Sequence, residues 1–550
     1  MESPAYRMTC FLHGQKRRFD IDLVPHGDSL CVEWGIERNL RGWRGSYTMG
    51  PEALENAERL SFRMPEDGNR LILSGEETFV LMPRAGYRGL RDKGRTVFNG
   101  SEYRLLDSLE VACSRMLLHA RDIHEGAEIW VLNDPERPLV WRMEGNPLEV
   151  DWSFESLDPD YLAVKADPTR AGGTYHAYPY VAEGKTPVPA SYEAFYVSHY
   201  GRHGSRYLTR DDRYLRPLEF YRSQLRAGNL TPLGEDFLNR LETLWSEVEG
   251  KGGQLSEIGE RQHKEIAGRL MERYPSLFVS GAVVEASSST SGRCVASMEA
   301  FCDSLLTACP GLSLTRRSDE ETMALLVPRN PAIDSLDSET SLWRTTVYED
   351  FKASHIHPQR LLRSLLRDVS RVPDPMAAAS DLYYLATGMQ DIPSAVDFDD
   401  LFTPEELYGA LQCVDTRMYY VNVAGTIGPQ SVRPLLKDIL DKADAAVSGA
   451  APAVATLRFG HDSILIRLLS LLGVRECAAR AADIGGYADA WVGWQVSPMA
   501  ANLQMVFLRD RRGYVLVKLL LNERETSIPA LGEGPYYDWD AFRAYAENLL

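Results

Sequence analysis

The chain has 550 residues, of which 44% are hydrophobic and 25% charged, and its formal net charge is −18. This length exceeds one ordinary hydrophobic core and predicts two or three domains. The net negative charge disfavours nucleic acid and anionic membranes as partners. The sequence contains no apolar run of about 18 residues or more, so no transmembrane helix is predicted. An anionic substrate would therefore need a local basic pocket.

The N-terminal residues and the cysteines limit the compartment only weakly. The start, MESPAYRMTCFLHGQKRRFD, lacks the apolar core of a secretory signal, so the protein is either cytoplasmic or has lost its signal. The eight cysteines form no CxxC pair, and we therefore expect no structural zinc site. Their even number permits disulfides without requiring them.

Residues 1–155 are expected to form a mostly β, sandwich-like domain of unknown role. Apolar and polar residues alternate over 19–23 and again over 30–34, with a turn between them. Turn residues inside 70–82 and 129–143 predict two further hairpins.

Two further segments, 105–120 and 156–192, need a separate interpretation. One stretch of the β domain, 105–120, could instead be helical. Residues 156–192 are rich in proline and glycine and are interpreted as a linker into the second domain.

Residues 193–550 alternate strands and helices, which predicts an α/β domain with a mainly parallel sheet. The domain begins with a short apolar strand at 195–197. Residues 318–432 are richer in helical patterning and are interpreted as a helical insertion.

The candidate site begins directly after the first strand of this domain, with Arg202-His203-Gly204-Ser205-Arg206. Active sites of open α/β sheets lie beyond the carboxyl ends of strands. Arginine grips two phosphoryl oxygens at once, and a neutral histidine between two arginines can attack phosphorus. Gly204 would let the backbone approach a ligand. The alternative is a basic surface turn.

Two later segments supply matching chemistry. Arg293 follows an apolar strand and could add a third guanidinium, although an arginine at a helix start also serves structural roles. His461 and Asp462 follow the strand at 455–459. His461 could donate a hydrogen bond to a phosphate, and Asp462 could protonate a leaving oxygen. A helix cap is the alternative for this pair.

These segments, in this order, resemble the histidine acid phosphatases, the second branch of the histidine phosphatases. The family's RHGxRxP motif corresponds to RHGSRYL at 202–208, with Leu208 in place of the proline. SSSTSGRCVASMEAF at 287–301 resembles the segment with the third arginine, and FGHDSILIRLLSLLGV at 459–474 resembles the His-Asp segment. SPMAAN at 497–502 and LNE at 521–523 are similar to the multiple inositol polyphosphate phosphatases. The resemblance spans about 160–550.

The resemblance implies a phosphoglycerate-mutase-like core with a helical cap at about 318–432. It implies hydrolysis of a small-molecule phosphate monoester, such as phytate, through a phosphohistidine at His203. Arg202, Arg206, Arg293 and His461 would hold the phosphoryl oxygens. Asp462 would be the acid, so we expect an acid pH optimum. The resemblance implies no metal, no cofactor and a periplasmic or extracellular location.

Arg210 and Arg213 leave two interpretations open. They could extend the basic pocket toward a second phosphate, or they could form a solvated charged turn with Asp211 and Asp212.

Two other functions are also open. A phosphotransferase or mutase of the same superfamily usually carries its acid elsewhere, as a glutamate, so Asp462 favours hydrolysis. A phosphate-ester binding protein with a vestigial site would release no phosphate. The oligomeric state is not predicted.

Overall fold

The computed structural model describes residues 5–12, 15–38, 41–61, 66–111, 115–146, 150–180, 182 and 186–550. The chain divides into two compact units, Met1–Pro159 and Asp160–Leu550. Within the described ranges, no helix has both the length and the apolar character needed to cross a membrane.

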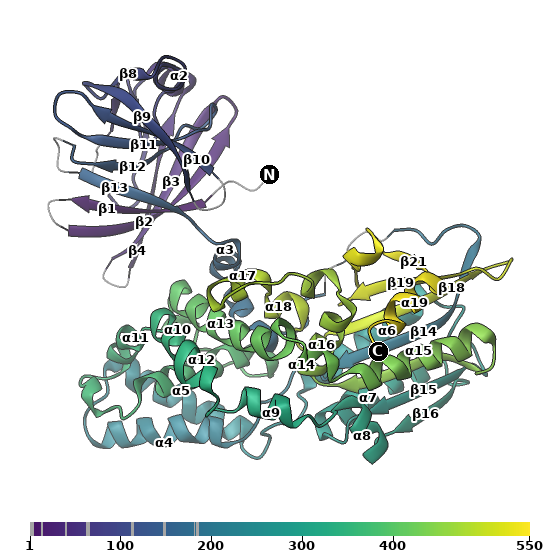
Figure 1. Ribbon diagram of the computed structural model, residues 1–550. Helices are drawn as coiled ribbons and strands as arrows, with labels where there is room; N and C mark the ends of the chain where they lie inside the picture. Colours follow the sequence, from purple (N-terminus) through teal and green to yellow (C-terminus); the bar gives the residue numbers. More distant parts are fainter. Residues whose placement is uncertain are drawn as a thin grey trace. The chain divides into compact units, whose positions relative to one another are not determined.

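The first unit is built around one eleven-stranded sheet with the order β6-β4-β3-β2-β1-β13-β12-β11-β10-β9-β8 (Figure 1). Neighbouring strands are antiparallel except β4 and β6. The strands are β1 (Ala5–Leu12), β2 (Gln15–His26), β3 (Ser29–Arg38), β4 (Arg41–Met49), β6 (Arg70–Ile72), β8 (Arg95–Phe98), β9 (Ser101–Val111), β10 (Arg115–Asp122), β11 (Glu128–Leu132), β12 (Val140–Glu144) and β13 (Val150–Ser156). Two further strands, β5 (Arg59–Leu60) and β7 (Glu77–Thr78), pair separately, and the helices are α1 (Pro51–Asn56) and α2 (Arg84–Lys93).

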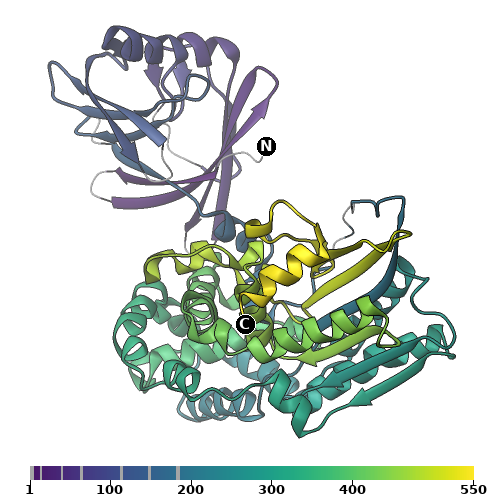
Figure 2. The same cartoon turned by 45° about the vertical axis from the view of Figure 1, so that its right-hand side comes forward.

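The mostly β character expected for this region is confirmed. Phe19, Ile21 and Leu23 are buried on β2, and Val32 and Trp34 are buried on β3. The alternation therefore marks the face of the sheet that covers the core, as period-two patterning requires. Figure 2 shows the sheet curled around this core.

In this unit one open alternative is decided, one local prediction was wrong and one is confirmed. The described residues of 105–120 are not helical, because β9 and β10 pair with each other and with strands on both sides. The expected hairpin at 70–82 is absent, since β6 pairs with β4 and β7 with β5, both in parallel. The hairpin at 129–143 forms from β11 and β12.

The second unit contains an eight-stranded sheet with the order β16-β15-β17-β14-β18-β19-β20, and β21 pairs with β19. β16, β15, β17 and β14 are parallel, as predicted, and the remaining strands extend the sheet antiparallel. The strands are β14 (Tyr192–Arg202), β15 (Val283–Ser288), β16 (Ser313–Arg317), β17 (Ala453–Gly460), β18 (Asn502–Asp510), β19 (Val515–Leu521), β20 (Arg524–Glu525) and β21 (Tyr536–Asp538).

Helices cover both faces of this sheet. α15 (Arg433–Ser448), α16 (Asp462–Leu472) and α19 (Trp539–Glu547) share one buried apolar cluster with residues of β14, β18 and β19. α6 (Glu257–Arg273) and α7 (Gly292–Ala308) share another with the opposite face. This is the layered α/β arrangement that the alternation of strands and helices predicted.

A group of helices forms the rest of the unit, and it draws on more of the chain than the predicted insertion. α4 (Asp212–Arg226) and α5 (Pro232–Val248) share a core with α11 (Pro358–Leu365) and α12 (Pro375–Gly388). The helices between β16 and α15 are α8 (Glu320–Leu326), α9 (Pro331–Asp337), α10 (Glu349–His355), α11 (Pro358–Leu365), α12 (Pro375–Gly388), α13 (Pro404–Tyr419) and α14 (Ile427–Gln430). Short helices α17 (Tyr487–Ala490) and α18 (Gly493–Val496) follow α16.

The segment interpreted as a linker contains regular structure. α3 (Pro159–Ala166) and the 3-10 segment η2 (Pro168–Tyr175) lie inside it. Asp167 caps η2 by accepting a hydrogen bond from the Thr169 amide, and proline at the first helical position is compatible with a helix start. Proline therefore begins these helices and does not break them.

Candidate active site

Parallel strands bring the predicted motifs to one edge of the sheet. Arg202, the last residue of β14, lies opposite Gly460 of β17, so His203 and His461 leave neighbouring strands together. The His203 amide donates to the Gly460 carbonyl at 3.0 Å. β15 lies on the other side of β17 and leads into α7, which carries Arg293.

His203 is buried and neutral, with one ring nitrogen free of its proton. Its side chain is buried, and Nδ1 lies 2.9 Å from the Gly204 carbonyl oxygen. Because a carbonyl oxygen only accepts, Nδ1 carries the proton and Nε2 keeps a lone pair. Burial, reinforced by Arg202, Arg206 and Arg293, lowers the pKa of His203 well below its ordinary value.

Three arginines surround this imidazole with unsatisfied donors. Arg202 donates to the Ser497 carbonyl at 2.7 Å, and Arg206 donates to the Tyr207 carbonyl at 2.8 Å. The Nε–H groups of Arg202, Arg206 and Arg293 are nevertheless buried without a hydrogen-bond partner among the described residues. Buried cationic donors of this kind are costly unless an anion receives them. The three arginines therefore form a candidate anion-binding site, called the cradle below.

His461 lies beside His203, with ring centroids 5.7 Å apart. Its Nδ1 lies 3.5 Å from Arg293 Nη2, and arginine can only donate, so Nε2 carries the proton. That Nε2 faces Ser289 Oγ at 3.3 Å. Burial and Arg293 lower the pKa of His461 to about 4. His461 is therefore neutral and would have to turn from Ser289 to donate to a phosphate.

Asp462 begins α16 and forms an ion pair with Arg202, Oδ2 to Nη2, at 3.0 Å. Burial would raise the pKa of Asp462, but Arg202 and His461 outweigh it and hold the pKa below its ordinary value. Without substrate Asp462 is therefore ionised. Its use as an acid requires a ligand that competes for Arg202.

Gly204 packs tightly against α6. A Cβ on Gly204 would lie 2.6 Å from the Gly259 carbonyl oxygen and 2.7 Å from Gly259 Cα. The glycine therefore permits close packing of the loop against α6, and its predicted role in the approach of a ligand stays a prediction.

Sequence comparison decides the family. A profile described as histidine phosphatase superfamily (branch 2) matches residues 201–522, more than half of the chain. The chain belongs to this family. The prediction of the family is thereby confirmed. The comparison with curated proteins found no match.

Solved structures support the fold of this branch 2 histidine phosphatase. A multiple inositol polyphosphate phosphatase of Bifidobacterium longum, in complex with inositol hexasulfate, is 20% identical, with a TM-score of 0.55 over 67% of this chain and 96% of the other. Its complex with phosphate is 19% identical, with a TM-score of 0.55 over 68% and 97%. The phytase from D. castellii is 17% identical, with a TM-score of 0.55 over 69% and 85%.

Arg210 and Arg213 each pair with an aspartate, and Arg213 Nη1 lies 3.8 Å from Asp381 Oδ1. Arg210 is exposed and pairs with Asp212 at 3.0 Å, which fits the solvated-turn interpretation. Arg213 is 5.9 Å from the Tyr384 ring centre, and the Tyr384 ring is 5.7 Å from that of Tyr175.

Tyr175 is a site residue that sequence reasoning missed. Its ring lies 4.9 Å from the Arg206 guanidinium, and it belongs to η2, in the segment interpreted as a linker. Arg213 is thus connected to the cradle through two tyrosine rings.

The open question of disulfides has an answer for the described cysteines. All seven are free: Cys10, Cys31, Cys294, Cys302, Cys309, Cys413 and Cys477. Cys113 lies outside the described residues. Burial raises the pKa of the Cys294 thiol to about 11, which fits a packed helix residue and not a nucleophile.

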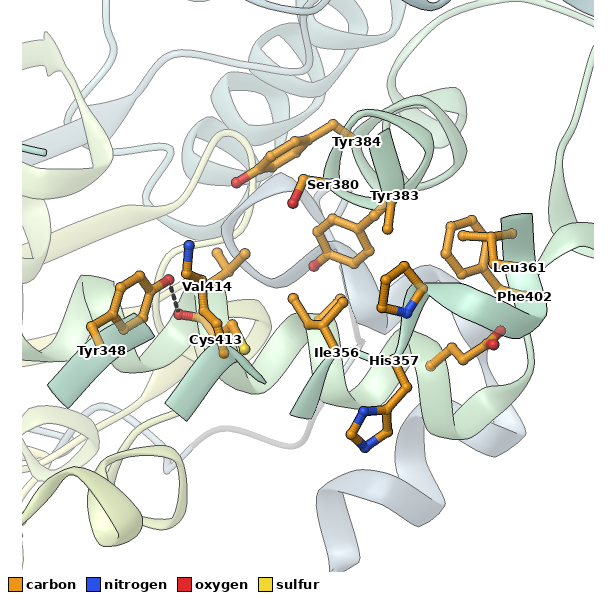
Figure 3. A pocket seen from close by; sticks show the side chains of 15 residues that line it. Tyr348, Ile356, His357, Leu361, Ser380, Tyr383, Tyr384, Phe402, Cys413 and Val414 are labelled. Atoms are coloured by element: carbon orange, nitrogen blue, oxygen red, sulfur yellow. Dashed lines mark hydrogen bonds between the residues drawn. The ribbon is translucent and has the colours of Figure 1, made fainter. Parts of the chain in front are cut away.

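A cavity elsewhere in the helical group contains none of the predicted site residues. It lies between α10, α11, α12 and α13, and Figure 3 shows the side chains that line it. The lining is mostly apolar, and the Tyr348 hydroxyl donates to the Cys413 carbonyl at 2.8 Å.

Proposed function

We propose that this protein hydrolyses phosphate monoesters through a phosphohistidine at His203. The observation that carries the proposal is the Nε2 lone pair of a neutral, buried histidine, among three arginines with unpartnered Nε–H groups. A phosphoryl group has the charge and the oxygens to receive these donors, and the imidazole is correctly protonated to attack it.

The first half-reaction transfers the phosphoryl group to His203. Nε2 bonds to phosphorus while the bond from phosphorus to the ester oxygen breaks, and Arg202, Arg206 and Arg293 stabilise the phosphoryl oxygens. A bound phosphate dianion competes with Asp462 for Arg202, which weakens their 3.0 Å ion pair and favours protonation of Asp462. Asp462 then gives its proton to the departing alcohol.

The second half-reaction restores the enzyme. Asp462, now ionised, takes a proton from water as the water oxygen attacks phosphorus. The bond from phosphorus to His203 breaks and inorganic phosphate leaves. No metal or cofactor takes part in this proposal.

We propose inositol polyphosphates such as phytate as the substrate class. Solved neighbours of the same fold are named as a multiple inositol polyphosphate phosphatase and a phytase. Arg213 is the better candidate of the two outer arginines for a second phosphate, because tyrosine rings connect it to the cradle. Both arginines have an acidic partner, Asp212 for Arg210 at 3.0 Å and Asp381 for Arg213 at 3.8 Å. Arg210 is the weaker candidate because its pair is the closer one and its side chain is 68% exposed, against 37% for Arg213.

The test is phosphate release from phytate and from p-nitrophenyl phosphate, at acid and neutral pH. His203→Ala should abolish release from both, whereas His357→Ala, at an exposed histidine of the same unit, should leave it unchanged. Turnover of the aryl ester alone would indicate that the substrates are simpler phosphate monoesters and not phytate. Undiminished activity of His203→Ala would refute the mechanism.

A location in the periplasm or outside the cell belongs to the same proposal. It depends on the family resemblance, and fractionation of the native cells would test it.

A further inference from the structure

The corner that follows α12 touches the candidate site. Asp391, the last residue of the 3-10 segment η5 (Met389–Asp391), is buried. Its Oδ1 accepts a hydrogen bond from the Ser205 hydroxyl at 2.6 Å, and its backbone carbonyl accepts one from the Ser256 hydroxyl at 2.5 Å. Asp391 Oδ2 is buried without a partner among the described residues.

Each polar group of Ser205, the hydroxyl, the amide and the carbonyl, makes a hydrogen bond. Its hydroxyl donates to Asp391 and accepts from Gln262 Nε2 at 2.8 Å, and its amide donates to Gln262 Oε1 at 2.9 Å. Its carbonyl accepts from the Ser256 amide at 2.9 Å. Because Ser205 lies between His203 and Arg206, these bonds fix the backbone that directs both side chains.

The neighbouring Gln390 holds the other side of the cradle. Its Oε1 accepts from the Ala177 amide at 2.9 Å, and its Nε2 donates to the Thr169 carbonyl at 2.8 Å. These bonds fix the segment in which the Thr174 carbonyl accepts from Arg202. Gln390 and Asp391, consecutive residues of η5 just after α12, therefore hold the two backbone segments that contact the cradle arginines.

We propose that Asp391 is a positioning residue: through the Ser205 hydroxyl it fixes the loop that carries His203 and Arg206 and ties this loop to the end of α12. The inference builds on the proposed function, because that function says what the loop holds. It adds a residue outside the motifs of the family resemblance.

The charge on Asp391 gives this role a measurable signature. The charged or titratable groups that face it are Arg202 and Arg206, at either end of the loop, and Tyr214 of α4, while α6 presents the uncharged Ser256 and Gln262. Burial raises the pKa of Asp391 to about 7. As the pH rises past neutrality, Asp391 becomes negative beside two guanidiniums, and anion binding must weaken.

The experiment measures the Kd of sulfate by calorimetry between about pH 6 and about pH 8.5, a range in which the charge of sulfate is constant. We expect the wild-type Kd to rise about tenfold. Asp391→Asn keeps an oxygen acceptor for Ser205 but carries no charge. The Kd of sulfate for this variant should therefore not change with pH. Asp399→Asn changes another carboxyl whose pKa burial raises, and which faces Asp397 and Asp400 and none of the cradle arginines, so it should keep the wild-type profile.

Ser205→Ala supplies an independent readout if Asp391→Asn does not fold. The Ser205 hydrogen bond holds the pKa of Asp391 down, so its loss should move the midpoint of the profile to higher pH. A flat wild-type profile, or identical profiles for wild type and Asp391→Asn, would overturn the inference. Sulfate binding can be measured without turnover, so this test is separate from that of hydrolysis. If the Kd of sulfate depends on pH as expected but the protein releases no phosphate, the role of Asp391 stands and the proposed hydrolysis is refuted.

Discussion

Acid should destabilise the second unit through a histidine that lies behind the site. His199 is in the middle of β14, 1% exposed, and both its ring nitrogens lack hydrogen-bond partners among the described residues. Burial, reinforced by the neighbouring His263, lowers the pKa of His199 from 6.5 to about 3. Between these values the unfolded chain binds a proton that the folded chain does not, so stability falls as the pH falls below about 6.5.

The size of the effect follows from the two pKa values. At pH 4 the unfolded His199 is almost fully protonated and the folded one is almost neutral, which removes about 3 kcal/mol from the free energy of unfolding relative to pH 7.5. His199→Leu removes the titrating group and places an apolar side chain between Phe301 and Phe459.

The assay is urea unfolding followed by tryptophan fluorescence at pH 7.5 and pH 4. Between these values the variant should lose about 3 kcal/mol less than wild type. His357→Leu, at an exposed position, should behave as wild type. Parallel losses in wild type and His199→Leu would refute the reasoning, because the proton uptake would then come from other groups.

Three further variants test the site. Asp462→Asn should lower kcat about 10²–10⁴-fold, with phosphoenzyme still forming from an activated aryl ester in rapid-quench experiments; an unchanged kcat would remove the acid role. Gly204→Ala places a Cβ 2.6 Å from the Gly259 carbonyl oxygen, so it should lower Tm and abolish activity, and a variant with wild-type Tm would contradict this packing. Arg213→Ala should raise KM for phytate and leave KM for p-nitrophenyl phosphate unchanged. Arg210→Ala is its matched control and should change neither, since the Arg210 side chain is 68% exposed, against 37% for Arg213, and pairs with Asp212 in the turn.

The sequence predicted that the candidate residues would lie together, because they belong to segments at the ends of strands. Arg202 ends β14, His461 directly follows β17, and Arg293 lies at the start of the helix that follows β15. Parallel strands end at one edge of a sheet, so these residues meet there. His461 Nδ1 and Arg293 Nη2 accordingly lie 3.5 Å apart, although the two residues are far apart in the sequence.

The residues that support this centre had no local signal. Asp391 lies 186 positions beyond Ser205, in a long helical stretch without a motif. Tyr175 was hidden among prolines and glycines that were interpreted as a linker. In the first unit, the pairing of β6 with β4 and of β7 with β5 depends on tertiary contacts, which a turn dipeptide at Ser74 and Gly75 does not specify.

Direct detection of the covalent intermediate tests the central claim. The protein would be mixed with an activated aryl phosphate, quenched within milliseconds and digested, and the phosphoryl group located by mass spectrometry under conditions that preserve phosphohistidine. Our account predicts a phosphoryl adduct on Nε2 of His203 that disappears when the substrate is exhausted and never forms in His203→Ala. Turnover without an adduct, or an adduct on another residue, would contradict it.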